Sequence, residues 1–242
     1  MNTPVPNLSV VVLCYKSGDT IHSFVDPLKD LLDKEEPEWE MILVGNYFPD
    51  TGDTTPQVVT AIADRHPRIA AVTQPKEGMM GWDMKTGLNR ATGKTIAVID
   101  GDNQMPYGDV IRVYRKLKEK HLDLAKTFRT VRDDGTYRRL ISAVYNLVFT
   151  VLFPGLNSRD INSKPKIMTR EAFGKLDLQS DDWFIDAEIM IQARRHRMKV
   201  GEVECVFRNL TDRPSFVKPG AILEFIGNLI AYRLKEFVPG KK

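Results

Sequence analysis

Two carboxylates and an amide follow one another closely in the sequence, directly after an apolar run. The run Thr95–Ile99 leads straight into Asp100, and Asp102 and Gln104 come soon after it. Gly101 permits a tight bend, so both carboxylates can turn toward one point. Carboxylate and amide oxygens suit Mg²⁺ or Mn²⁺ held together with a substrate diphosphate. A simple turn is the competing interpretation, but the position after a strand favours the metal site.

The elements that would position this segment alternate between strands and helices. The sequence predicts strands at Leu8–Cys14, Met41–Val44, Ile69–Val72 and Thr95–Ile99, and helices at Asp19–Leu32, Thr55–Arg65 and Met84–Ala91. Such alternation predicts an α/β fold with a mostly parallel sheet flanked by helices. Right-handed crossovers then place the ligand crevice at the carboxyl ends of the strands, where Asp100 falls.

The second half of the chain is less regular. It predicts helix Asp109–Lys120, strand Leu122–Phe128, a basic loop Arg129–Tyr137, apolar helix Arg138–Phe153, strand Ile167–Thr169, helix Phe184–Arg197, strand Val200–Phe207 and helix Ala221–Phe237. No repeat or linker-like stretch interrupts it. We therefore expect one continuous domain over residues 1–242.

Composition excludes several classes of protein. Of 242 residues, 42% are hydrophobic, which excludes disorder as the dominant state. A net charge of +3 argues against a dedicated nucleic-acid binder, and two cysteines make neither a disulfide scaffold nor a cysteine-rich zinc site. Without a signal peptide or an apolar run of ~18–20 residues, we expect a cytoplasmic protein, with peripheral contact to the cytoplasmic face of a membrane left open.

Three motifs follow one another along the chain: Leu8-Ser-Val-Val-Val-Leu-Cys-Tyr-Lys-Ser, Gly87-Leu-Asn-Arg-Ala-Thr-Gly-Lys and Asp100-Gly-Asp-Asn-Gln-Met-Pro. They resemble motifs of family-2 glycosyltransferases with the GT-A fold, nearest the branch of dolichyl-phosphate mannose synthases and other polyprenyl-phosphate glycosyltransferases. The first resembles the first strand and nucleotide-binding turn of that family, the second the segment before its metal strand, and the third its Asp-Ala-Asp-x-Gln-x-Pro motif. The resemblance covers nearly the whole chain.

The resemblance assigns roles on the donor side. It implies that Asp100, Asp102 and Gln104 bind Mg²⁺ or Mn²⁺ on the diphosphate of a nucleotide diphosphate-sugar, with Asp102 central to catalysis. Donor contacts are expected from Cys14, Tyr15, Asn46, Asp53, Asp100, Gly101, Arg208 and Arg213. Either of the two arginines matches the family's diphosphate-closing loop. Its base-recognition motif Val-x-Asp-Gly-Ser-x-Asp is altered here between Val44 and Asp53, so the nucleotide stays open.

The acceptor side is expected in the second half. Arg138-Arg-Leu-Ile-Ser142 resembles a helix start that holds a lipid phosphate, and residues four apart share a helix face. Arg129 or Arg132 would be the second arginine of that site. A solvated basic loop before an ordinary helix is the alternative. The apolar face of this helix suits a bilayer surface, though core packing explains it equally.

Two acidic segments follow. Asp160-Ile-Asn-Ser-Lys-Pro-Lys stands where the branch has Asp-x-x-x-x-Phe-Arg, so Lys166 keeps a cation there. Asp186, or else Asp182, stands in the region where relatives that glycosylate hydroxyls have their general base. A phosphate acceptor is already ionised and needs no base, which would leave these residues to positioning or helix capping.

The resemblance therefore implies a metal-dependent inverting glycosyltransferase that moves a sugar from a nucleotide diphosphate-sugar to a polyprenyl phosphate. Residues 1–104 would form the donor half and residues 105–242 the acceptor half. Transfer to a sugar hydroxyl of a glycan acceptor is the alternative reaction. Two hypotheses belong to other classes. A catalytically silent nucleotide-binding scaffold would have no chemical need for the Asp100–Gln104 segment. Nucleotidyl transfer would call for a glycine-rich, lysine-containing loop after the first strand, which the sequence lacks.

Overall fold

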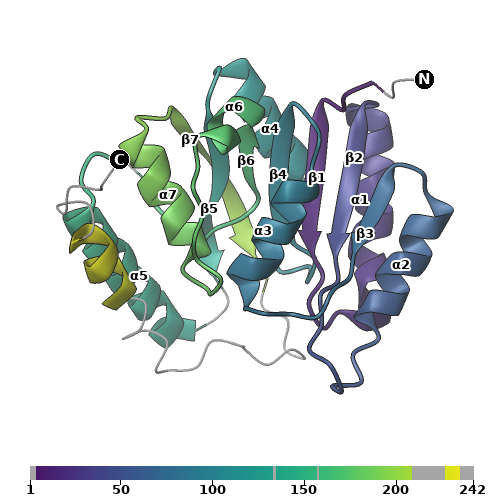
Figure 1. Cartoon of the computed structure of the whole chain (residues 1–242). Helices are drawn as coiled ribbons and strands as arrows, with labels where there is room; N and C mark the ends of the chain where they lie inside the picture. The colour runs from purple at the N-terminus through teal and green to yellow at the C-terminus, as the bar shows by residue number, and fades with distance from the viewer. Residues whose placement is uncertain (1–3, 133–134, 157, 209–226, 235–242) are drawn as a thin grey trace.

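The structure, a computed structural model, describes residues 4–132, 135–156, 158–208 and 227–234 (Figure 1). At 131–132 and 135–142 only the backbone is described. The strands are β1 (Leu8–Leu13), β2 (Trp39–Val44), β3 (Ile69–Val72), β4 (Thr95–Asp100), β5 (Leu124–Arg132), β6 (Lys166–Thr169) and β7 (Val200–Phe207). The helices are η1 (Gly18–Ile21, 3-10), α1 (His22–Glu35), α2 (Thr55–Arg65), α3 (Met80–Arg90), α4 (Asp109–Glu119), α5 (Gly135–Leu152), α6 (Arg170–Gly174) and α7 (Ile185–Arg195). Residues 227–234 are also helical.

All seven strands join one sheet in the order β3-β2-β1-β4-β6-β5-β7. Strands β3, β2, β1 and β4 pair in parallel, β6 runs antiparallel to both its neighbours, and β5 pairs in parallel with β7. The predicted mostly parallel α/β sheet is confirmed. The register places Leu13 beside both Val44 and Asp100, so β1, β2 and β4 end together at one edge.

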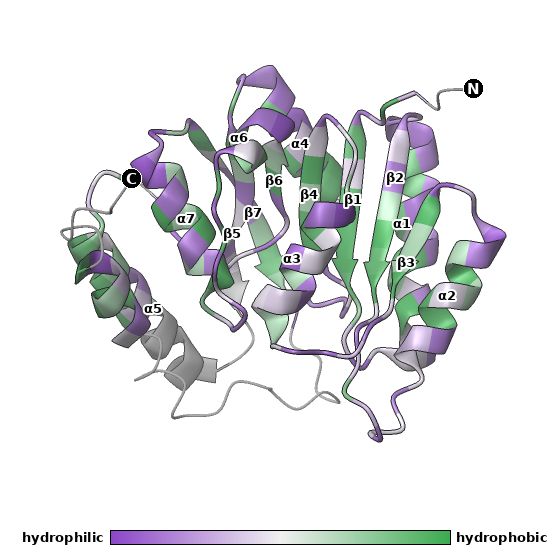
Figure 2. Ribbon diagram, viewed as in Figure 1, coloured by the Kyte–Doolittle hydropathy of each residue, from purple (hydrophilic) through white to green (hydrophobic). Residues whose placement is uncertain are grey.

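Two apolar cores cover the two faces of this sheet. Side chains alternate along β1, so Val10 and Val12 belong to one core while Val11 and Leu13 belong to the other. The first core takes the apolar faces of α1, α2 and α4, and the second those of α3, α5 and α7. In Figure 2 strands β1 and β4 are correspondingly apolar along most of their length. This double burial explains why β1 and β4 read as continuous apolar runs.

The main differences from prediction lie in the second half. Strand β5 continues to Arg132, so the residues from Arg129 onward begin as strand rather than loop, and α5 starts at Gly135 rather than Arg138. Pairing with β7 along this length, with a bulge between Arg129 and Val131, overrides the polar composition. Helix α6 was not predicted. Of the predicted helix Ala221–Phe237, residues 227–234 are described and helical.

Candidate active site at the carboxyl edge of the sheet

The segment after β4 is a tight loop that carries both predicted carboxylates. Asp100 is the last residue of β4, and the backbone N–H of Gly101 donates to the Leu13 carbonyl at 2.9 Å. The Asp102 carboxylate accepts from the backbone N–H of Gln104 at 3.0 Å, which closes a turn. Asn103 at its centre has φ 61° and donates to Ser23 Oγ at 2.7 Å. The turn and the metal site are therefore compatible interpretations of the same residues.

Gly101 is needed here for space. A Cβ at this position would lie 2.6 Å from Ile21 Cδ1 and 2.9 Å from Val12 Cγ1, while its φ is outside the left-handed region. Gly101 was expected to permit a bend of the chain. In the structure a glycine is needed instead because the residue after β4 packs closely against η1 and β1. The glycine lets Asp100 and Asp102 emerge directly above the core.

Gly101→Ala is expected to destabilise the protein by about 1–3 kcal/mol, because the added methyl overpacks this contact. Chemical denaturation monitored by circular dichroism measures the change. Gly174→Ala is the matched control, since a Cβ at Gly174, the last residue of α6, meets nothing within 4 Å. Equal stability of the two variants would contradict the packing argument.

A lysine that the sequence did not single out contacts Asp100. The ammonium of Lys164 lies 3.2 and 3.1 Å from the two carboxylate oxygens of Asp100, and 3.2 Å from Asp186 Oδ2. Lys166 pairs with the other oxygen of Asp186. The four side chains form a chain of alternating charge that runs from the edge of the sheet into the core. The available signal was the spacing of the two lysines, since residues two apart point to the same side of an extended segment.

The pKa values of this chain of charges follow from burial and pairing. Burial opposes the charged form of Lys164, but Asp100 and Asp186 outweigh it and raise the pKa of the ammonium. Burial lowers the pKa of Lys166 to about 8 despite its contact with Asp186. Burial also opposes ionisation of Asp186, yet the two lysines together hold the pKa of its carboxyl below its usual range. Asp186 is therefore a buried anion at neutral pH.

This setting does not suit the predicted role of Asp186 as a general base. A base must accept a proton during the reaction, and a carboxylate held between two ammonium groups is a poor acceptor. The alternative base, Asp182, accepts from the backbone N–H of Phe184 at 2.8 Å, which closes a turn just before α7. Both acids thus make contacts that hold them in place, and a role as general base stays a prediction.

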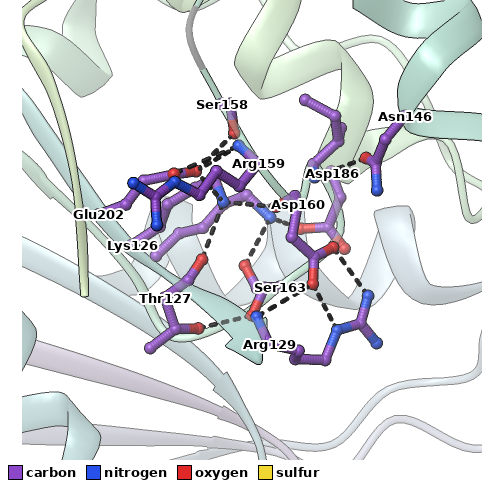
Figure 3. Close-up of polar contacts among 12 residues, drawn as sticks. Lys126, Thr127, Arg129, Asn146, Ser158, Arg159, Asp160, Ser163, Asp186 and Glu202 are labelled. Atoms are coloured by element: carbon purple, nitrogen blue, oxygen red, sulfur yellow. Dashed lines mark hydrogen bonds and ion pairs between the residues drawn. The ribbon is translucent and has the colours of Figure 1, made fainter. Parts of the chain in front are cut away.

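Arg129, predicted to bind the acceptor phosphate, is paired with Asp160 (Figure 3). Its Nε and Nη2 donate to the two carboxylate oxygens at 2.5 and 2.8 Å, and its guanidinium lies 5.4 Å from the Phe207 ring centroid. Lys126 donates to the Asp160 carbonyl and lies 3.0 Å from Glu202. This network anchors the segment before Lys164 and gives Arg129 a structural partner that the sequence did not reveal.

The other acceptor residues are only partly described. Arg138 and Ser142 both lie within α5, as their helical spacing predicted, but their side chains are outside the described residues. Arg213 lies outside them altogether. Their assignment to phosphate binding stays a prediction.

On the donor side, Tyr15 follows β1 at the expected edge and Cys14 does not expose its side chain. The Tyr15 ring makes an edge contact with Phe48 and lies 4.2 Å from the ammonium of Lys76. Cys14 is buried, and its thiol donates to the Val12 carbonyl at 3.3 Å. The expected donor contact through Cys14 is thus limited to its backbone, while Tyr15 keeps its position at the crevice.

Asn46 is part of a buried network rather than a free base-reading group. Its amide nitrogen donates to Asp83 and Thr86, both at 3.0 Å, and its oxygen accepts from the backbone N–H of Gln74 at 3.1 Å. Asp83 is also paired with Lys76, although burial raises the pKa of its carboxyl. Asn46 therefore links the end of β2 to α3, and its expected contact with the donor stays a prediction.

Asp53 lies in the segment between β2 and α2, and Arg208 lies at the end of β7. Asp53 Oδ1 accepts from the backbone N–H of Thr55 at 3.0 Å, and its buried Oδ2 has no hydrogen-bond partner among the described residues. Asp53 borders a cavity of about 650 Å³ between residues 47–53 and α2. Arg208 directly follows β7, and its backbone N–H donates to the Gln104 carbonyl at 2.9 Å. The fold therefore brings Arg208 to the loop of the two carboxylates across a long sequence separation.

The residues of this loop fit a divalent cation. Asp100 is one-third exposed at the edge of the sheet and Asp102 is half-buried beside it. Within the described part of the chain, no three His, Cys, Asp or Glu side chains come together to enclose a metal. Two carboxylates and the Gln104 amide form the partial set of oxygen ligands with which Mg²⁺ is typically held alongside a substrate phosphate.

Sequence comparisons give relatives of known name. The chain is 25% identical over 225 residues to the dolichyl-phosphate beta-glucosyltransferase ALG5C of Trichomonas vaginalis, covering 84% of this chain and 64% of that protein. It is 28% identical over 145 residues to the dodecaprenyl-phosphate galacturonate synthase of Rhizobium johnstonii, covering 58% and 41%. The chain thus spans less than two thirds of the length of these curated relatives.

Structural comparison confirms the predicted GT-A fold. Glucosyl-3-phosphoglycerate synthase from Mycobacterium tuberculosis, solved with Mn²⁺, UDP and glucosyl-3-phosphoglycerate, superposes with a TM-score of 0.71 at 20% identity. The match covers 94% of this chain and 80% of that one. The sequence profile of glycosyl transferase family 2 matches residues 9–176, more than half of the chain. The chain belongs to glycosyl transferase family 2.

Proposed function

We propose that the chain is a metal-dependent inverting glycosyltransferase that moves a sugar from a nucleotide diphosphate-sugar to a polyprenyl phosphate. The observation that carries this proposal is the Asp100–Gln104 loop at the carboxyl edge of the sheet, joined to Arg208 by a backbone hydrogen bond. Family membership and relatives named for dolichyl-phosphate and dodecaprenyl-phosphate chemistry support it.

Asp100, Asp102 and Gln104 would hold the divalent cation. When bound, such a cation supplies positive charge to the leaving diphosphate as the anomeric C–O bond breaks. The chain contributes a loop fixed in advance, because the turn at Asp102 and the bond from Arg208 to Gln104 hold it in place. The backbone of Arg208 contacts the same loop, and its guanidinium would add a second positive charge where negative charge develops.

The acceptor side favours a phosphate over a hydroxyl. An ionised phosphate oxygen can attack in line, from the face opposite the leaving group, without losing a proton. A hydroxyl needs a base, and Asp186 is held as an anion between Lys164 and Lys166. This difference is why the polyprenyl phosphate acceptor is proposed ahead of a sugar hydroxyl.

The surface of α5 offers a contact for the lipid. One face of the helix packs in the core through Tyr145 and Phe149, yet Leu147 and Val151 on the other are 64% and 70% exposed. Residues 227–234 expose Ile230 and Leu234 nearby, and Arg233 lies against Phe153 at the end of α5. We assign this apolar surface to the prenyl chain or to the membrane that carries it. None of the described helices combines the length and apolarity needed to cross a bilayer.

The test offers UDP- and GDP-sugars, radiolabelled in the sugar, with Mn²⁺ and a polyprenyl phosphate. Label is expected to pass into the organic phase as a glycosyl phosphodiester, with the nucleoside diphosphate released in equal amount. Polyprenol without the phosphate is the matched acceptor control and should remain unlabelled. Equal labelling of the polyprenol, or of a glycan offered instead, would establish the hydroxyl reaction and refute the proposal.

A further inference from the structure

The contact between Lys164 and Asp100 places a cation where the proposed metal ligands begin. The Lys164 ammonium faces both oxygens of the Asp100 carboxylate, and its remaining neighbours are Asp186 Oδ2 at 3.2 Å and Met80 Sδ at 3.3 Å. The lysine side chain is 4% exposed, whereas that of Asp100 is 33% exposed. The negative charge of Asp100 is thus neutralised by a buried ammonium on one side, while its other side is accessible to solvent.

Lys164 is not needed to neutralise the core. Asp186 already has Lys166 as a partner on its other oxygen, and Lys166 also donates to the Ser163 carbonyl at 3.1 Å. The carboxylate of Asp186 and the ammonium of Lys166 would by themselves form a neutral buried ion pair. The ammonium of Lys164 instead connects this pair to Asp100 at the edge of the sheet. This position points to a role for Lys164 at the crevice.

A divalent cation at Asp100 has to share the carboxylate with this ammonium. Two positive centres on one carboxylate repel each other, and water screens this repulsion little on the side of Lys164, whose side chain is buried. A bound diphosphate brings negative charge that offsets this repulsion. Metal and nucleotide should therefore bind with positive coupling, and by linkage each strengthens the other equally.

We propose that Lys164 is a resident counter-ion of Asp100 that keeps the affinity for a divalent cation low until a nucleoside diphosphate is bound. This inference rests on the proposed metal-dependent donor site. It assigns to Lys164 the control of the order of binding: metal enters with the donor rather than before it. After the product diphosphate leaves, Lys164 again neutralises Asp100.

The test measures Mn²⁺ binding without turnover. Free Mn²⁺ is followed by electron paramagnetic resonance while protein is titrated, first with MnCl₂ alone and then with UDP or GDP present. Lys164→Gln is expected to bind Mn²⁺ alone about tenfold more tightly than the wild type, since one adjacent positive charge is gone. With nucleotide the difference should shrink, so the coupling between metal and nucleotide falls by a similar factor.

Two matched variants control for charge and for side-chain shape. Lys164→Arg keeps the positive charge and should bind Mn²⁺ alone like the wild type. Lys94→Gln removes the same formal charge just before β4, at the opposite end of that strand from Asp100, where Lys94 contacts Asn7, and should also leave Mn²⁺ binding unchanged. If Lys164→Gln fails to fold, Lys164→Met, which can pack beside Met80, replaces it in the same titration.

The outcomes separate this inference from the proposed function. If the wild type binds Mn²⁺ with UDP or GDP, but Lys164→Gln binds Mn²⁺ alone no more tightly than the wild type, Lys164 is only a structural cation and the inference is overturned. If the wild type binds no Mn²⁺ even with either nucleotide, the proposed donor site itself fails. A tighter metal site in the variant supports the inference directly, since structural damage does not tighten a site.

Discussion

Asp102→Asn is expected to lower the rate of sugar transfer by about a hundredfold or more, because it removes one negative ligand of the proposed cation that would stabilise the leaving diphosphate. The Asn side chain can still accept from the backbone N–H of Gln104, so the turn is retained. Measured kcat/KM with polyprenyl phosphate should fall, while the unfolding temperature in the absence of ligand stays unchanged.

The same variant tests whether Asp102 binds the metal that activity requires. In the wild type, Mn²⁺ together with the correct nucleotide should raise the unfolding temperature, because a ligand that binds only the folded state stabilises it. Asp102→Asn should lose this metal-dependent rise. The control is Asp30→Asn, which removes an exposed carboxylate on α1. Full activity in Asp102→Asn would show that the metal does not depend on this carboxylate. Absence of sugar transfer in the wild type, with nucleotide binding retained, would favour the nucleotide-binding scaffold.

Asp186→Asn is expected to destabilise the fold by about 3–5 kcal/mol, the usual cost of breaking a buried ion pair from one side. The change leaves the buried ammonium groups of Lys164 and Lys166 without the carboxylate that they share. Denaturant unfolding measures the loss. The matched control is Asp181→Asn, which breaks the pair with Lys85 at a side chain that is 53% exposed and should cost below about 1 kcal/mol.

The pH dependence of this loss has a definite sign. The pKa of Asp186 is lowered in the folded state, so its ionised form contributes stability that is fully present above its ordinary unfolded pKa near 4. The contribution is lost as the pH falls through the lowered folded pKa. The gap in stability between wild type and Asp186→Asn should therefore close as the pH falls into the acid range. It should also narrow as the pH rises toward 8, because the pKa of Lys166 is about 8 and a neutral lysine no longer needs the carboxylate. A gap that stays the same from about pH 6 down to about pH 2 would contradict the pairing.

The sequence predicted the first half of the fold well because that half is built from local signals. Helix α2 and strand β3 have the predicted bounds, and β4 delivers Asp100 to the carboxyl edge as expected. Apolar runs, helix periodicity and turn residues are each short-range patterns. Once the strands are parallel, their carboxyl ends must share an edge, so the place of Asp100 followed from topology.

Predictions failed where long-range pairing decided the outcome. Arg129 was expected in a loop, but strand β5 pairs with β7 and continues through this residue. The guanidinium of Arg129 forms an ion pair with Asp160. Asn46 was expected to contact the donor, and the sequence did not show that its side-chain amide donates to Asp83 and Thr86 on α3. Neither partner is near in sequence, so no local pattern could have revealed these contacts.

By itself, the sequence determined the α/β class, the family and the position of the Asp100–Gln104 loop, because these depend on periodicity and on a contiguous motif. Only the tertiary structure decided which charges surround that loop. The antiparallel strand β6 beside β4 is what carries Lys164 to Asp100 and Lys166 to Asp186. The electrostatics of a site depend on distances of a few ångströms between segments far apart in the chain, and those distances are fixed by strand order and register.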